Sequence, residues 1–573
     1  MTLGIRFRPR LLEALKHYSR QDLLADLTAG ATVGLVALPL AMALAIASGL
    51  KPEIGIFTSV VAGILISALG GSLVQVGGPA GAFVPLLAPI VATHGPEGLI
   101  VASLIAGLIL IVMGMTGLGG LIKYIPYPVV TGFTSGIAII ILSTQINDFF
   151  GLNMKLPPDF IGKIEALAGH FRPNALTLAI SVASVLLIFA WPKAWGRRVP
   201  GSIAAITLGA AAVNLFHLES FGIQTIGTQF GGIPLGFPSP HWPRLPFDEW
   251  RNLLNASLTI AILGAIESLL CAVVADGMID DRHDSNQELM GQGIANIGSA
   301  LFGGMPATGV IARTATNVRS GARTPVAGII HSLTLLVILL LAAPVASNIP
   351  LASLGAVLVV VALRMGEWHQ FARLRHWPKS DVAVFLCSFI LTVVTDLPFA
   401  VKTSLLLAAA LLVKRLSDTT RVITDEEVTH ASAPEQSVNG KTVPKGVMVF
   451  RVFGAFFFGA VDKLETALRR AGQEPDVLIL RMRDVLAMDA TGLDALEDLM
   501  EKLRAKKKHL LLCGPHMQPL VALERAGFID RLGRDNLCGD MDHALDRARE
   551  LLGLKPGGSS AEAGGQTITQ PMK

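Results

Sequence analysis

The stretch Gly-Gly-Met-Pro-Ala-Thr-Gly at residues 303–309 interrupts an apolar part of the chain, and Gly-Gly-Pro-Ala-Gly at residues 77–81 follows the same pattern. In each stretch, two glycines and a proline stand where a continuous membrane helix would otherwise be expected. Irregular backbone is tolerated at membrane depth only where it is buried in protein or lines a cavity. The two stretches therefore predict a pair of interrupted membrane helices.

The composition divides the chain into two parts. The 573 residues are 51% hydrophobic and 16% charged, whereas an ordinary soluble domain carries roughly 25% charged residues. Charged residues are sparse before Leu416 and frequent after it, so we expect a membrane domain followed by a small soluble domain. The net charge of +4 is small and no basic stripe with interleaved aromatic residues occurs, which argues against a nucleic-acid partner.

The first part contains about fourteen apolar segments, most of them close to the roughly 20 residues that a membrane-spanning helix needs. We predict spans near residues 28–48, 54–70, 73–93, 98–118, 128–147, 175–192, 200–216, 254–275, 288–302, 305–318, 325–343, 351–364, 380–396 and 398–414. An even number of spans places both termini on one side of the membrane. That side is predicted to be cytoplasmic because the first segment carries Arg6, Arg8, Arg10, Lys16 and Arg20.

The spacing of the two interrupted stretches suggests an inverted repeat. About seven predicted spans separate them, as in inverted-repeat secondary transporters with a midplane site. Proline is favoured in the first turn of a helix, so we expect Pro79 and Pro306 each to begin a half-helix. Two such half-helices would direct free N–H groups and positive dipole ends at one place, where a dehydrated anion could bind. The alternative is that the glycines only allow helices to cross closely.

Two charged residues, Glu267 and Arg313, lie inside otherwise apolar segments. An isolated charge at the bilayer centre costs at least about 2.5 to 3.5 kcal/mol, so each should face a partner or water. Arg313 is suited to give an anion a fixed positive charge, and Glu267 to take up a proton or a sodium ion. The alternative is a structural salt bridge between the two side chains.

The soluble part reads as an α/β domain of about 100 residues. Strands are predicted at residues 447–458 and 476–482, and helices at 462–471, 492–505 and 517–526. The predicted division of the whole chain is a cytoplasmic N-terminal segment at 1–27, a transmembrane domain at 28–415, a linker at 416–445, the soluble domain at 446–553 and a disordered tail at 554–573.

Enzyme motifs are missing from the sequence. There is no His-Glu-x-x-His, and Gly440-Lys441-Thr442 lacks the upstream glycine of a phosphate-binding loop. The four cysteines are far apart and have no nearby set of histidine ligands. We expect no enzymatic activity, no cofactor and no metal site.

Around the second interrupted stretch the sequence resembles the sulfate permease (SulP) anion transporter family. The most specific match is residues 296–309, continuing through 311–317 and 320–325. The soluble part resembles a STAS domain, the usual C-terminal partner in this family, with Asp489-Ala490-Thr491-Gly492-Leu493 as its signature turn. Residues 38–45 and 264–274 are most similar to the branch of the bacterial C4-dicarboxylate transporter DauA.

The resemblance implies a polytopic α-helical membrane protein with fourteen spans in two inverted repeats of seven, a core subdomain that moves against a gate subdomain, and a homodimer. It implies an anion site between the starts of the third and tenth spans, with Arg313 as the anion-site arginine and Glu267 as the coupling carboxylate. We expect the substrate to be bound by Pro79, Ala80, Gly81, Phe83, Pro306, Ala307, Thr308, Gly309, Ala312 and Arg313.

Some positions depart from the family pattern. In the sodium-coupled bicarbonate branch, an Asp stands at the position of Glu267 and threonines stand at those of Cys271 and Ile311. The loss of these oxygen ligands argues against sodium. In the STAS domain we expect Asp489 to cap the helix that starts at residue 491 or 492. Thr491 occupies the place that is phosphorylated in soluble STAS relatives, with an unmodified structural turn as the alternative.

We therefore expect a proton-coupled secondary transporter of the bacterial inner membrane, with both termini cytoplasmic. It would move sulfate or a C4-dicarboxylate by an elevator-like motion, and a cytosolic protein could bind its STAS domain. The alternatives are a channel-like anion conductor, a bicarbonate transporter, and a membrane-tethered regulator in which the STAS domain acts.

Overall fold

The structure is a computed structural model of the whole chain. It describes residues 7–120, 126–192 except 155 and 158, 200–234, 247–424 except 396, 443–457 and 475–555, together with 236, 238–240, 242–243, 463–464 and 466–468. The chain forms two compact units, Met1–Ala408 and Ala409–Lys573.

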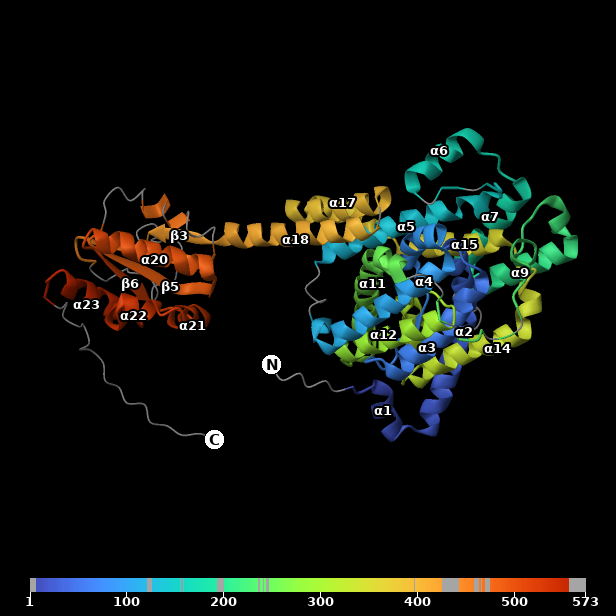
Figure 1. Cartoon of the computed structure of the whole chain (residues 1–573), viewed down its shortest axis with the longest axis horizontal. Coiled ribbons are helices and arrows are strands. Elements are labelled where there is room, and N and C mark those ends of the chain that lie inside the picture. Colours follow the sequence, from blue (N-terminus) through green and yellow to red (C-terminus); the bar gives the residue numbers. More distant parts are fainter. Residues whose placement is uncertain are drawn as a thin grey trace. The chain divides into compact units, whose positions relative to one another are not determined.

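The first unit is built of helices (Figure 1). They are α1 (Arg10–Ala14), α2 (Arg20–Ala47), α3 (Pro52–Leu69), α4 (Val84–Met115), α5 (Tyr127–Phe150), α6 (Phe160–His170), α7 (Ala175–Ala190), α9 (Gly201–Phe216), α10 (Ile226–Phe230), α11 (Phe247–Ile279), α12 (Ser285–Leu301), α13 (Ile311–Arg319), α14 (Val326–Ala346), α15 (Leu351–Met365), α16 (Trp368–Arg373), α17 (Lys379–Val394) and α18 (Leu397–Thr419), the last of which continues into the second unit.

Each predicted span overlaps one of these helices. The third and fourth predicted spans fall in α4, which is broken at Gly95, where φ is 66° and a left-handed conformation turns the chain. Among the described residues, six helices are long and apolar enough to cross a membrane by themselves, and three further apolar helices are shorter. The fold is thus a polytopic helical membrane domain, as the sequence predicts.

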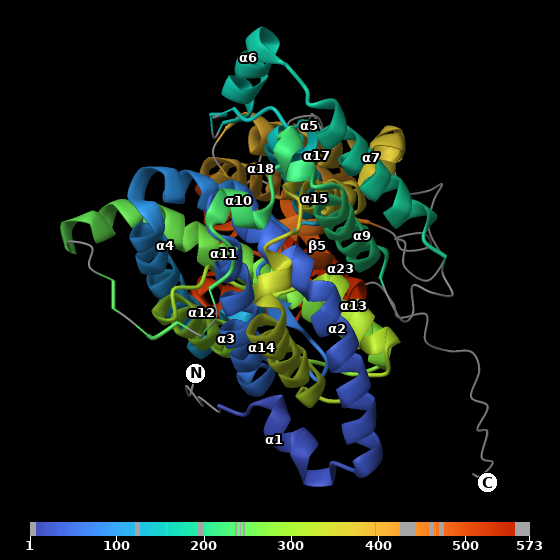
Figure 2. The same ribbon diagram turned by 90° about the vertical axis from the view of Figure 1, so that its right-hand side faces the viewer.

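The helices of the first unit pack in two groups (Figure 2). Helices α2, α3, α4, α11, α12, α13 and α14 pack chiefly against one another, and α5, α7, α9, α15 and α17 form the second group. Glycines allow close crossings: a Cβ atom on Gly107 of α4 would lie 2.7 Å from the carbonyl oxygen of Gly293 on α12. The two groups are the core and gate subdomains.

The second unit contains a five-stranded sheet with the strand order β3-β4-β5-β6-β7. The strands are β3 (Arg421–Thr424), β4 (Val447–Phe456), β5 (Val477–Met488), β6 (His509–Cys513) and β7 (Leu537–Cys538). Strand β3 is antiparallel to β4, and the remaining pairs are parallel. Helices α20 (Ala490–Ala505), α21 (Met517–Arg525), α22 (Phe528–Leu532) and α23 (Met541–Leu551) complete the unit.

Both faces of the sheet are apolar because alternate residues of the strands point to opposite sides. Leu478 and Leu480 pack with buried residues of α20 and α22, whereas Val477 and Ile479 pack with those of α23. This is an α/β domain, as predicted for the soluble part, with the additional elements β6, α22, β7 and α23.

The predicted linker at 416–445 differs from the structure in part. It contains the end of α18 and β3, whose residues pair with β4 in the sheet. A strand of only four residues carries too little periodicity to be recognised in the sequence. The rest of the linker from 425 to 442, most of the predicted helix at 462–471 and the predicted tail beyond Lys555 lie outside the described residues.

Candidate anion site

The two interrupted stretches lie side by side in the first unit. Residues Gly77–Gly78 form the short strand β1 and Thr308–Gly309 form β2, and the two strands pair in antiparallel orientation. Gly77 lies opposite Gly309, and the N–H of Val310 donates to the carbonyl of Val76 at 2.9 Å. Segments far apart in the sequence therefore meet at the point where both helices are interrupted.

A half-helix follows each strand, but neither begins at its proline. A 3₁₀ turn at Gly81–Phe83 leads into α4, and α13 begins at Ile311. Pro79 lies before the residue that caps the 3₁₀ turn, and Pro306 lies in the extended segment before β2. The prediction that these prolines begin the half-helices is wrong: the backbone stays extended after Pro306 through β2, and after Pro79 through Ala80, the residue that caps the 3₁₀ turn.

We call residues 303–313 the β2 arm. The side chain of Asn296 on α12 accepts a hydrogen bond from the N–H of Ala307 and donates one to its carbonyl, both at 2.9 Å. The N–H of Met305 donates to Thr58 Oγ1 on α3 at 2.8 Å, and its carbonyl accepts from Ser299 Oγ at 2.9 Å. The extended segment before β2 is thus held by side chains of the core helices.

We call residues 71–83 the β1 arm. The N–H of Val76 donates to Thr314 Oγ1 on α13 at 3.0 Å, and Asn317 Nδ2 on the same helix donates to the carbonyl of Val74 at 2.9 Å. At the beginning of the arm, the N–H of Gly71 donates to Glu288 Oε2 on α12 at 2.8 Å. Helix α13, whose first residues end the β2 arm, therefore also fixes the β1 arm.

Helix α11 contacts both arms. Thr308 Oγ1 donates to the carbonyl of Gly264, and Gln75 Nε2 donates to Ser268 Oγ, both at 2.9 Å. Glu267 lies on the same helical face, three residues after Gly264. Its side chain is partly buried, and within the described part of the chain no hydrogen bond or ion pair joins it to Arg313. The salt bridge considered as the alternative is therefore not present.

Arg313 is the largest polar side chain buried at the site, with 2% of its surface exposed. Its Nη1 donates to Ser59 Oγ on α3 at 3.3 Å, whereas Nε and Nη2 have no hydrogen-bond partner among the residues that the structure describes. A Cβ atom on Gly78 would collide with Nη1, so the guanidinium group lies against the backbone of β1. A buried positive charge thus stands directly beside the strand pair.

The remaining predicted binding residues divide between the two arms. Pro79, Ala80 and Phe83 are buried in the β1 arm, and Pro306 and Ala307 are buried in the β2 arm. Ala312, at the start of α13, is exposed. The strand pairing brings these segments together. Each half-helix begins with small or apolar side chains, so no bulky polar side chain stands at its first N–H groups.

Gly81 lies where the core meets the gate. A Cβ atom on Gly81 would lie 3.2 Å from Ile141 Cδ1 on α5, 3.7 Å from Met365 Sδ on α15 and 3.8 Å from Leu44 Cδ2 on α2. Helices α5 and α15 belong to the gate subdomain. The β1 arm therefore contacts the gate at the beginning of its half-helix.

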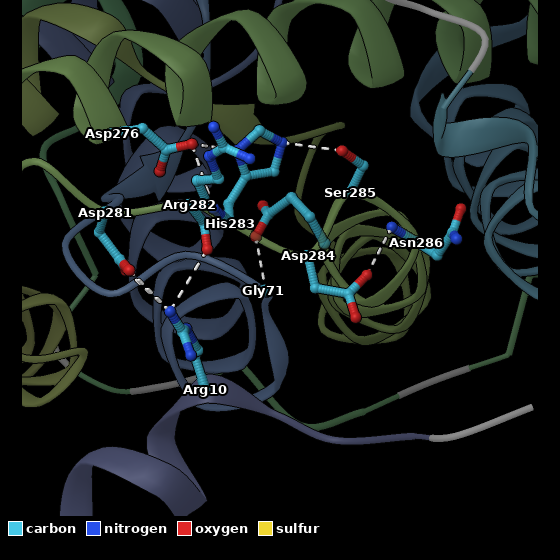
Figure 3. Close-up of polar contacts among 10 residues, drawn as sticks. Arg10, Gly71, Asp276, Asp281, Arg282, His283, Asp284, Ser285 and Asn286 are labelled. Carbon is cyan, nitrogen blue, oxygen red and sulfur yellow. Dashed lines mark hydrogen bonds and ion pairs between the residues drawn. The ribbon is translucent and has the colours of Figure 1, made fainter. Parts of the chain in front are cut away.

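A polar cluster lies where the β1 arm leaves α3 (Figure 3). Arg10 forms an ion pair with Asp281 at 2.9 Å, and His283 Nδ1 lies 2.7 Å from Asp276 Oδ2. The N–H of Asp284 donates to the carbonyl of Gly71, and that of Arg10 to the carbonyl of Gly70. The N-terminal segment is thus bound to the core at this end of the arm, a contact that no sequence motif indicates.

In the second unit, Asp489 caps α20. Its Oδ1 accepts a hydrogen bond from the N–H of Gly492 at 2.8 Å, and the helix begins at Ala490. Thr491 is exposed in the first turn of this helix. The structure leaves both alternatives for Thr491, a modified residue and an unmodified structural turn, as predictions.

Comparison with known proteins identifies the family of the chain. Residues 23–388 match the model of the sulfate permease family, and residues 441–543 match that of the STAS domain. The chain belongs to the sulfate permease family.

Relatives of this sulfate permease family member span nearly its whole length. The protein named "Putative sulfate transporter YvdB" of Bacillus subtilis (strain 168) is 39% identical over 545 residues, covering 94% of this chain and 99% of YvdB. The "Bicarbonate transporter BicA" of Synechocystis sp. (strain ATCC 27184 / PCC 6803 / Kazusa) is 30% identical, covering 93% and 95%. At the level of the family, the chain is a membrane transporter and not an enzyme.

The fold of this family member agrees with a solved structure. The murine Slc26a9 anion transporter in the inward-facing state superposes with a TM-score of 0.84 over 94% of each chain, at 18% sequence identity. This likeness concerns the fold alone. The relatives bear the names of sulfate and bicarbonate transporters, so the C4-dicarboxylate branch stays a prediction.

Proposed function

We propose that this chain is a proton-coupled secondary transporter of sulfate in the bacterial inner membrane, with both termini in the cytoplasm. The observation that carries the proposal is the contact between β1 and β2 beside the buried Arg313, two of whose nitrogen atoms lack a partner. A divalent oxyanion suits a site with one fixed charge and two half-helix starts.

The anion would bind between the first turns that follow β1 and β2. The N–H groups of Gly81 and Ala82, and those of Ile311 and Ala312, stand at the starts of their half-helices, where intrahelical acceptors are missing, and would be available to oxygen atoms of the substrate. Arg313 would add a positive charge from within the core, without a lysine or arginine exposed at the surface of the site. The small residues at the two helix starts would let the anion approach the backbone.

Glu267 would be the coupling group. It lies one helical turn from Gly264, whose carbonyl holds Thr308 of β2. As a partly buried carboxylate for which the described part of the chain offers no hydrogen bond or ion pair, it would take up a proton when the anion binds, because protonation removes an uncompensated charge from the membrane interior.

Transport would follow from movement of the core against the gate. Hydrogen bonds tie the two arms to α3, α11, α12 and α13, all of which belong to the core. The site would therefore travel with the core as one body, in the manner of an elevator. We further propose that the chain works as a homodimer and that a cytosolic protein binds the STAS domain.

The test is uptake into proteoliposomes of labelled sulfate, succinate and bicarbonate, each with and without a pH gradient. We expect saturable sulfate uptake that a proton gradient drives. Preferred uptake of succinate would assign the protein to the C4-dicarboxylate branch, and large currents without saturable exchange would replace the proposal by an anion channel.

The coupling assignment has a separate test in Glu267→Gln. The variant should lose accumulation driven by the proton gradient and keep exchange of sulfate across the membrane, because the neutral amide cannot release a proton. If Glu267→Gln still accumulates sulfate under a proton gradient, Glu267 is not the coupling group. Loss of function on deletion of residues after Leu416, with full function in Arg313→Ala, would instead favour a STAS-centred regulator.

A further inference from the structure

Asn296 on α12 makes an unusual contact with the β2 arm. The side chain is 1% exposed, and its carboxamide bonds to both backbone groups of Ala307 at 2.9 Å. The same Nδ2 also donates to the carbonyl of Gln292 at 2.8 Å, one turn earlier on α12. All three bonds are buried.

The two bonds between Asn296 and Ala307 take the place of those that a neighbouring strand would make. In a sheet, the N–H and the carbonyl of one residue both bond to the strand alongside. Ala307 precedes β2, and the carboxamide of Asn296 supplies the donor and the acceptor that a strand would provide. Buried backbone groups that lose their partners are costly, so Ala307 is held in one position relative to α12.

Helix α12 also holds the other arm. Gln292 Nε2 donates to Glu288 Oε1 at 3.0 Å, and Glu288 Oε2 accepts from the N–H of Gly71 at 2.8 Å. One face of α12 is thus bonded to Ala307 near the strand pair and to Gly71 at the beginning of the β1 arm. The helix serves as a common support for both arms.

We infer that Asn296 is a positioning residue of the anion site: it sets where the N–H groups that follow β2, and Arg313 with them, stand relative to the anion. It does not touch the anion itself. The inference rests on the proposed function, since the anion it positions is the transported sulfate.

The test compares Asn296→Asp with Asn296→Ala and with the control Asn286→Asp. Aspartate has the size of asparagine, but an ionised carboxylate cannot donate to the carbonyl of Ala307 and repels it. Asn286 lies on the same helix, and its Oδ1 accepts from the N–H of Gly119 at 3.1 Å, a role that aspartate keeps. The control therefore adds the same charge to α12 while keeping the hydrogen bond that the Asn286 side chain accepts from Gly119.

In sulfate uptake assays we expect Asn296→Asp to raise KM by about tenfold or more, as the loss of a buried hydrogen bond and a new repulsion would require. Its kcat should change much less. Asn296→Ala should also raise KM, and Asn286→Asp should match the wild type. If Asn296 only filled space, Asn296→Asp would keep the wild-type KM, because aspartate has the same shape. A wild-type KM in Asn296→Asp therefore overturns the inference.

Hydrogen exchange of the full chain in detergent gives a readout that does not depend on transport. Amides of residues 303–310 should exchange faster by about tenfold in both Asn296 variants, because the lost bonds protect this segment. Unchanged exchange there overturns the inference even if uptake falls. If the wild type takes up no sulfate while exchange responds as expected, the proposed function fails and the positioning of the arm by Asn296 stands.

Discussion

The β1 arm and the β2 arm occupy equivalent places in an inverted repeat, yet they differ in chemistry. The β2 arm carries its own polar side chains at the site, Thr308 and the buried Arg313. The half-helix of the β1 arm begins with Ala80, Gly81, Ala82 and Phe83, which are all apolar or without a side chain. The positive charge of the site is thus supplied by one arm alone.

The two arms also differ in the helices that they contact. The β2 arm is bonded to α3, α11 and α12, which are core helices. The β1 arm is also bonded to the core, through α11, α12 and α13, but in addition it meets the gate helices α5 and α15 at Gly81. We infer that the β2 arm chiefly determines affinity for the anion, and that the β1 arm chiefly determines how the core slides past the gate.

The largest effect is expected from removing the charge of the β2 arm. Arg313→Gln should lower kcat/KM for sulfate by about 100-fold, because the buried charge proposed to pair with the anion is lost. Arg313→Lys should recover part of the activity. Proteoliposome uptake measures both, and Arg319→Gln, which changes an exposed arginine at the end of the same helix, is the matched control. Uptake by Arg313→Gln at the wild-type level would abolish the distinction between the arms.

The sequence reveals the features that depend on local backbone chemistry. Glycine and proline mark the interrupted stretches, and their inverted spacing leads to the contact that β1 and β2 make. The starts of the half-helices were not predictable in the same way. Pro306 precedes β2, so the pairing of two strands far apart in the sequence keeps the backbone extended beyond this proline and overrides its local preference for the first helical turn. Pro79 directly follows β1, and the helical turn begins two residues after it, at Gly81.

The polar supports of the site were beyond sequence reasoning for a different reason. Asn296, Glu288 and Gln292 lie on α12, which reads as an ordinary membrane span. Which buried polar side chain bonds to which backbone group depends on how α12 lies against the two arms, and a single sequence does not contain that information. Polar residues in a buried span do indicate that bonded partners exist, because buried polar groups need partners, but they do not identify those partners.

A smaller effect is expected where the two arms touch. A Cβ atom on Gly309 would collide with the side chain of Gln75, which is buried and bonded to Ser268. Gly309→Ala should therefore lower kcat/KM for sulfate by about tenfold, as overpacking of a buried contact does. The uptake assay measures this decrease. Gly120→Ala serves as the control, because a Cβ atom on Gly120 would meet open space. Gly321→Ala is less suitable because Gly321 has a positive φ. Wild-type uptake by Gly309→Ala would show that the two arms can move apart at this contact while the anion site stays functional.

The smallest effect is expected from Gly81→Ala, and it tests the role of the β1 arm in movement. The added methyl group would lie 3.2 Å from Ile141 Cδ1, so the gate side chain has to shift by a few tenths of an ångström. Because Ile141 belongs to the gate and the anion-binding groups of the β2 arm are untouched, we expect kcat for sulfate to fall by about threefold with KM unchanged, as for a change in a conformational step.

The double variant Gly81→Ala with Ile141→Val should recover the wild-type rate, because valine removes the carbon atom that the new methyl group meets. This recovery is specific to a contact between core and gate. If Gly81→Ala instead raises KM and Ile141→Val does not restore it, the β1 arm contributes to binding as the β2 arm does, and the functional difference between the arms reduces to the position of a single arginine.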